Sequence, residues 1–182
     1  MSQTSINQAG FPIAVAGQVS QTREGMDIVS RFSGEASTRI GFGLAVKAGT
    51  SEHEVLLPTA ANSVVQGVVK FGYNHTPGAT GDLDQDSTPP GLKPNASIEL
   101  MRQGTMWVQI DADTAIATPG ETRAYCRFES DGGSNTKVGT FRHTDDTHVI
   151  DTRNQVVFVS GVRTAADGTK IAEVDVNFGI KP

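Results

Sequence analysis

Cysteine, tryptophan, tyrosine and charge are all scarce in this chain. Among its 182 residues there are one cysteine, one tryptophan and two tyrosines, and charged residues make up 19%. A single cysteine, Cys126, excludes an internal disulfide and a multi-cysteine metal site. The net charge of −5 provides no basic footprint for nucleic acid, so we expect no nucleic-acid partner.

A long apolar run is also missing. The first five residues are polar and carry no Lys or Arg, and no apolar run follows that could serve as a signal peptide or a membrane span. We therefore expect no membrane partner, and synthesis and retention in a reducing cytoplasm.

Glycine, proline and small polar residues take the place of the missing types. The chain holds 20 Gly and 8 Pro, and hydrophobic residues make up only 37%. This composition is typical of a loop-rich, all-β protein. Strand signals recur at short intervals after residue 26, over 28–32, 42–47, 54–57, 64–71, 98–110, 122–128, 137–143, 155–160 and 171–178.

The alternation within these segments predicts which faces are buried. In 106–111 apolar residues alternate with Trp107, Gln109 and Asp111, which is typical of a half-buried strand, and Gly104 marks a break or bend before it. The apolar run 155–160 indicates a strand buried on both faces. No long helical stripe exists in the sequence. We predict a compact body over 26–182, either a β-barrel or a β-sandwich.

Residues 1–25 read as an extended amino-terminal arm. The segment from Phe11 to Gly17 is apolar, but Pro12 and the flanking glycines deny it a helix. It can form an edge strand of its own domain, or reach a neighbour, because low-charge extended segments pair readily with foreign sheet edges. Phe11, Pro12 and Ile13 are therefore candidate protein-contact residues.

An inserted loop is predicted over 73–96. It contains four prolines and three glycines, and no strand or helix pattern is visible in it. Loops this long are usually functional or disordered, so the segment is either a surface insertion or a partner contact. Tyr73 and His75 within it are candidate contacts. Trp107 is a further one, because it is either a plug beneath a loop or an interface anchor.

No constellation in the sequence assembles a catalytic or metal site. Asp82, Asp84 and Asp86 begin like a calcium loop, but the required glycine and glutamate are absent further on. The cluster from His143 to His148, with Asp151, matches no zinc spacing. Cys126 lies in a strand pattern and is most simply a packed thiol. We expect no enzyme activity, no cofactor and no metal.

The order of segments resembles the structural cement proteins, or capsid decoration proteins, of tailed bacteriophages. The resemblance covers nearly the whole chain and rests on Ala14–Gly17, Asp27–Ser30, Ile40–Val46, Val55–Pro58, Gly67–Val69, Ile98–Leu100, Gly104–Val108, Pro119–Glu121 with Tyr125, and the strands around Val157 and Val174.

The resemblance implies a β-rich protein that binds the outer surface of the assembled head and stabilises contacts between major capsid proteins, typically as a homotrimer in the virion. The inserted loop departs from the compact connection expected of such proteins. Two other classes stay open. One is another phage structural β module, such as a tail or fibre component, or a carbohydrate-binding domain, for which the 6% of aromatic residues is low. The other is a metal-dependent hydrolase that uses 143–151.

Overall fold

The computed structural model describes residues 14–21, 25–36, 38–71, 83–84, 91–165 and 167–178, and within these ranges it contains strands and turns but no helix. The strands are β1 (Val19–Gln21), β2 (Asp27–Ser33), β3 (Ile40–Gly41), β4 (Ala45–Ala48), β5 (Glu54–Leu56), β6 (Val65–Val69), β7 (Leu83–Asp84), β8 (Gly91–Leu92), β9 (Ser97–Gln109), β10 (Tyr125–Arg127), β11 (Phe141–Arg142), β12 (Val149–Asp151), β13 (Val156–Phe158), β14 (Arg163–Thr164) and β15 (Lys170–Asn177). The all-β prediction is confirmed.

Five strands close into a small barrel. Their order is β9-β2-β5-β4-β6, and a further pairing of β6 with β9 completes the ring. All these pairs are antiparallel except β2 with β5, which are parallel and meet only at the end of β2. The barrel and not the sandwich is therefore the architecture of this part of the body.

The barrel has its own hydrophobic core. Aliphatic and aromatic side chains of alternate strand positions fill it, as the pleat of a strand requires. Its buried members are Ile40, Phe42, Leu44, Val46, Val55, Leu57, Val69, Leu92, Ala96, Ile98 and Leu100. Leu92 and Ile40 come from a separate three-stranded sheet, β3-β8-β7, so this small sheet adds to the barrel core.

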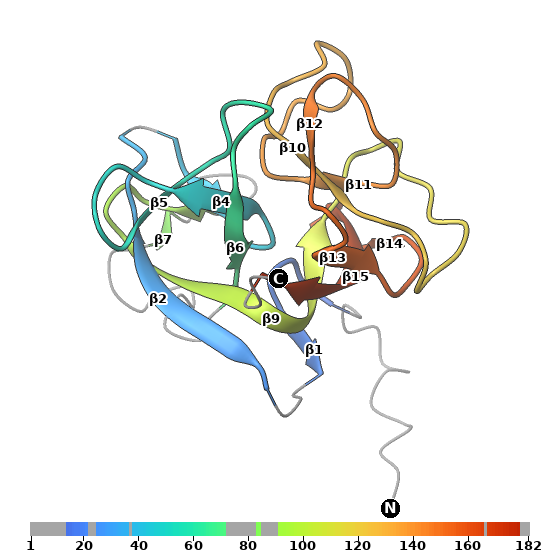
Figure 1. Ribbon diagram of the computed structural model, residues 1–182, viewed down its shortest axis with the longest axis horizontal. Helices are drawn as coiled ribbons and strands as arrows, with labels where there is room; N and C mark the ends of the chain where they lie inside the picture. Colours follow the sequence, from blue (N-terminus) through green and yellow to red (C-terminus); the bar gives the residue numbers. More distant parts are fainter. Residues whose placement is uncertain are drawn as a thin grey trace, which may run out of the picture.

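The thirteen-residue strand β9 connects the barrel to a second unit, which we call the lobe (residues 110–178). Figure 1 shows β9 running beneath both, with β2, β4, β5 and β6 on one side and β10 to β15 on the other. The amino-terminal half of β9 pairs with β2 and β6, whereas its carboxy-terminal half pairs with β15 and β1. Gly104, at φ +134°, lies where the strand passes from one set of partners to the other.

The lobe is built on a second, larger core. Strands β13 and β15 extend the sheet from β9, and a three-stranded sheet, β11-β10-β12, packs with them. The last strand alternates as the sequence predicts, with Ala172, Val174 and Val176 buried and Asn177 exposed.

Two predicted burial patterns were wrong. Gln109 and Asp111 are 4% and 3% exposed, so the second half of β9 is covered on the face that the sequence assigned to solvent. The run 155–160 is not buried on both faces, because Val157 is only half-buried between buried Val156 and Phe158. In both cases the sequence pattern indicates a strand, but the burial of each face depends on which other elements pack over it.

The described part of the predicted arm lies against the body. β1 pairs with β9, Gly17 N–H donates to the Trp107 carbonyl at 2.7 Å, and Phe71 N–H donates to the Gly17 carbonyl at 2.8 Å. The remaining residues of the arm, 1–13 and 22–24, lie outside the described residues. The described residues of the inserted loop include β7 and β8, although the sequence showed no strand pattern there.

Candidate functional site

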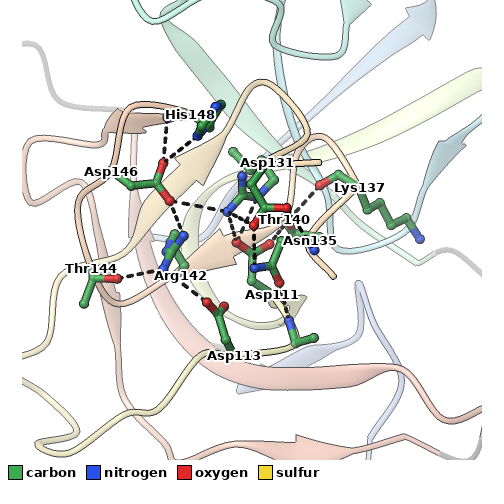
Figure 2. A network of polar contacts seen from close by, with 12 residues as sticks. Asp111, Asp113, Asp131, Asn135, Lys137, Thr140, Arg142, Thr144, Asp146 and His148 are labelled. Atoms are coloured by element: carbon green, nitrogen blue, oxygen red, sulfur yellow. Dashed lines mark hydrogen bonds and ion pairs between the residues drawn. The ribbon is translucent and has the colours of Figure 1, made fainter. Parts of the chain in front are cut away.

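A buried ion pair organises the loop-rich end of the lobe (Figure 2). Arg127 extends from β10, and its Nε and one terminal nitrogen donate to a single oxygen of Asp111 at 2.8 and 2.6 Å. The two side chains are 0% and 1% exposed. A charged pair so deeply buried needs further hydrogen bonds to offset its desolvation.

Those further bonds come from neighbouring loops. The second oxygen of Asp111 accepts a hydrogen bond from Thr140 Oγ1, and the remaining terminal nitrogen of Arg127 donates to the Glu129 carbonyl at 3.1 Å. The Asn135 side-chain amide donates from Nδ2 to Asp131, and its Oδ1 accepts from Ala112 N–H at 2.9 Å. The 129–136 loop is thereby tied to the residues that follow β9.

A second arginine continues the network toward the surface. Arg142 of β11 donates to Asp146 and, at 3.0 Å, to Thr144, and it lies 3.4 Å from Asp113. Asp146 also accepts from the backbone N–H of His148 at 2.6 Å. The 143–148 segment is therefore held by the same set of charges that surrounds Arg127.

The electrostatics of this network favour charged groups at its centre. Desolvation alone would lower the pKa of Arg127, but the hydrogen bonds and charge of Asp111, with Asp146 and Asp131 nearby, more than offset it, and the pKa of Arg127 lies above its ordinary value. The hydrogen bond from the Asn135 side chain, then those from the backbone, hold the pKa of Asp131 below its ordinary value. Both shifts favour the charged forms of Arg127 and Asp131, so these two groups keep the contacts that tie the lobe loops together.

Groups that suggested chemistry in the sequence have structural roles here. His143 accepts a hydrogen bond from Ala115 N–H at 3.2 Å, and the described residues contain no group of three His, Cys, Asp or Glu side chains placed to hold a metal ion. Cys126 is fully buried, and desolvation raises the pKa of its thiol far above the ordinary value. Asp82 and Asp86 lie outside the described residues.

Of the predicted contact residues, only Trp107 lies in the described part of the chain. Its half-buried side chain packs against a small cluster of Ala14, Ala165 and Ile171, with Ala16 beside it. Residues of the amino-terminal segment thus cover part of the Trp107 side chain, and the remainder stays exposed. Phe11, Pro12, Ile13, Tyr73 and His75 lie outside the described residues.

A groove separates the barrel from the lobe on another face. Its volume is about 700 Å³, and it lies between the β5–β6 connection and the β12–β13 turn. Val64, which is 68% exposed, lines one wall. Arg153 and Asn154, both with positive φ, form the turn on the other wall. Sequence reasoning did not identify either this groove or the Arg127–Asp111 pair. The signal for the pair was a lone arginine between Cys126 and Phe128 in an otherwise apolar strand.

None of the described segments is a helix long and apolar enough to cross a membrane. Comparison with known proteins identifies the chain's relatives. The family model described as "Structural cement protein (E217 gp24/Pam3 gp6)" matches residues 2–177. No curated protein matches the chain. Among solved structures, a chain from "The capsid of Myoviridae Phage XM1" superposes with a TM-score of 0.63 at 15% identity, over 99% of this chain and 100% of that one. That likeness shows a shared fold.

Proposed function

Since the chain belongs to the structural cement protein family, we propose that it binds the outer surface of an assembled phage head and stabilises the contacts between major capsid proteins. The observation that carries the proposal is the family match, which spans residues 2–177 and so includes the barrel, the connecting strand and the lobe.

The physical character of the body supports a structural role. A protein that holds neighbouring shell proteins together fixes their spacing only if its own surface loops keep fixed positions. The Arg127–Asp111 pair and the hydrogen bonds around it fix two such loops at the end of the lobe, 129–136 and 143–148. We therefore propose that the protein has no catalytic activity and that these charges serve rigidity.

Assembly of the protein on the head follows from the same proposal. We propose that major capsid proteins are its partners and that it acts as a homotrimer, so that several weak contacts add up to tight attachment. Since such a protein binds the assembled lattice and not its separated parts, it stabilises the lattice by mass action. Residues 1–13, which precede the hydrogen-bonded segment at Ala14–Gln21, are the part of the arm that we assign to partner contacts, with Tyr73, His75 and Trp107 as further candidates.

The proposal is tested with heads of the phage that encodes this chain, prepared without the protein. Purified protein added to such heads should co-sediment with them at saturating stoichiometry, and it should not bind unassembled major capsid protein to the same extent. Protease added to intact, filled particles should cleave bound protein while leaving the packaged DNA inside, because the protein lies outside the shell. Failure to co-sediment, or protection from protease on intact particles, would overturn the binding or the outer location, respectively.

A further inference from the structure

In the part of the chain that the structure describes, the β2 strand has one edge that is paired only at its end. On one side β2 pairs with β9 along its whole length, from Asp27 to Phe32. On the other side it pairs with β5 only at Phe32 and Ser33. Among the described residues, the ring of hydrogen bonds is thus complete at one end of β2 and open along the remainder.

The direction of the free backbone groups follows from the strand geometry. Phe32 N–H donates to the His53 carbonyl, on the β5 side, whereas Ser33 N–H donates to the Ala96 carbonyl, on the β9 side. Successive residues of a strand point their backbone groups to opposite sides. Ile28 and Ser30 therefore direct their N–H groups to the open side, and neither has a backbone partner among the described residues.

The edge is lightly protected and carries an apolar contact point. The Ser30 carbonyl accepts a hydrogen bond from the neighbouring Arg31 guanidinium at 2.8 Å, in an exposed position from which an incoming strand can displace it. Phe32, which is 36% exposed, is one of two large hydrophobic side chains exposed in the described part of the chain, and it shares a face with Ser30. An unpaired edge with such a side chain is a template for strand addition.

The same chain supplies a suitable strand. Thirteen residues precede Ala14, and residues 1–22 contain no Asp, Glu, Lys or Arg. Four or five residues span about 15 Å as a strand, so the thirteen-residue segment is more than twice as long as the open part of β2. The uncharged segment meets no repulsion from Asp27 or Arg31, and it offers Ile6 and Phe11 as apolar partners for Phe32.

We propose that residues 1–13 of one copy add a strand to the open edge of β2 in a second copy. The inference goes beyond head binding but rests on the proposed homotrimer, since a head-to-tail contact of this kind closes into a ring when the rotation between copies permits. Residues 1–13 of each copy then act as the strand donor, and the open edge of β2 in the next copy acts as the strand acceptor. Each copy has one of each, and three copies satisfy all of them.

Two variants separate the donor from the acceptor. Deletion of residues 1–13 removes the donor and keeps β1 and the Gly17 contacts. Ser30→Pro removes the N–H at the open edge and places a ring there, while the β9 ladder keeps its bonds through the residues on either side. Proline is tolerated at strand edges for this reason. Ser30→Ala is the matched control, because it keeps the N–H.

The experiment measures mass in solution by light scattering. We expect the full chain and Ser30→Ala to be trimers, and the deletion and Ser30→Pro to be monomers when alone. A mixture of the two monomeric variants has one donor and one acceptor per pair, so it should form a 1:1 dimer. That outcome also shows that both variants are folded.

Amide hydrogen exchange gives an independent readout. Exchange at Ile28 and Ser30 should be slow in the full chain and at least tenfold faster in the deletion variant. A full chain that is monomeric with slow exchange would mean that the arm pairs within its own copy. Trimers that survive both changes, or fast exchange at both amides in every form, would also contradict the proposal. Head binding is scored separately, so a trimer that fails to bind heads overturns the proposed function and leaves the arm exchange standing.

Discussion

Arg127 and Asp111 meet at 2.6 and 2.8 Å with neither side chain in contact with solvent, and they lie sixteen residues apart on either side of a long loop. The pair joins β10 to Asp111, the second residue after the end of β9, and residues of the lobe loops are hydrogen-bonded to the pair in turn. Position of those loops thus depends on a contact that neither strand pairing nor the hydrophobic core provides.

Asp111→Asn is predicted to destabilise the protein by about 3–5 kcal/mol, because it leaves the Arg127 charge buried without a counter-charge. Chemical denaturation at pH 7 measures the change. Asp113→Asn is the matched control, since Asp113 is half exposed and lies 3.4 Å from Arg142, and such pairs contribute about 0–1 kcal/mol. Equal losses in unfolding free energy for the two variants would show that the buried pair contributes no more to stability than the exposed one.

Gly43 is predicted to be intolerant of alanine. Its φ is +72°, and a Cβ there would lie 2.9 Å from the Gly17 nitrogen and 3.1 Å from the Gln109 nitrogen, which are backbone atoms that cannot move aside freely. Gly132→Ala is the control, because its φ is +74° with nothing within 4 Å of an added Cβ.

The left-handed conformation costs about 1–2 kcal/mol in both variants, so the additional loss in Gly43→Ala reports the close approach of the arm to the barrel. We expect a clearly lower thermal midpoint for Gly43→Ala than for Gly132→Ala. Coinciding melting curves would contradict the packing described for Gly17 and Gly43.

Much of this architecture follows from the sequence, and the omissions have physical causes. The sequence predicts strands over 28–32 and 171–178, the second from its alternating side chains, and the structure has strands at 27–33 and 170–177. The sequence does not decide between a barrel and a sandwich, because register and partner choice depend on contacts between residues far apart in the chain. The sequence predicts Asp111 at the surface because a carboxylate in a strand usually faces water. Arg127, sixteen residues away, comes next to it only through tertiary packing. The sequence likewise gives no sign that Leu92, in a proline-rich segment, is a core residue.

The lowered pKa of Asp131 predicts that the folded protein loses stability in acid. Its pKa is lowered in the folded protein by Asn135 and the backbone N–H groups around it, so at about pH 4 the unfolded chain binds more protons than the folded one. Stability from this group is therefore present above that range and is lost as the pH falls through the lowered pKa. Asp131→Asn should flatten the fall in unfolding free energy between pH 5 and 3. Chemical denaturation at intervals of about half a pH unit measures this fall in both proteins. An unchanged slope would contradict the assignment.

Lys137 makes the opposite contribution at high pH. Burial lowers the pKa of its amino group despite the opposing charge of Asp167, and the ion pairs found among the described residues do not include it. The folded state thus binds fewer protons near pH 10, so stability should rise with pH there. Lys137→Met should be neutral or stabilising at pH 7, by up to about 1 kcal/mol, and the difference should vanish near pH 11. A destabilising effect at pH 7 would indicate that the ammonium has a favourable partner.

The temperature at which filled heads release their DNA tests the central claim most directly. Heads that lack the protein should release DNA at a lower temperature than complete heads, and adding back the purified full chain should restore the higher value in proportion to the amount bound. An unfolded or heat-inactivated sample serves as the control. The same release temperature with and without bound protein would contradict a cementing role.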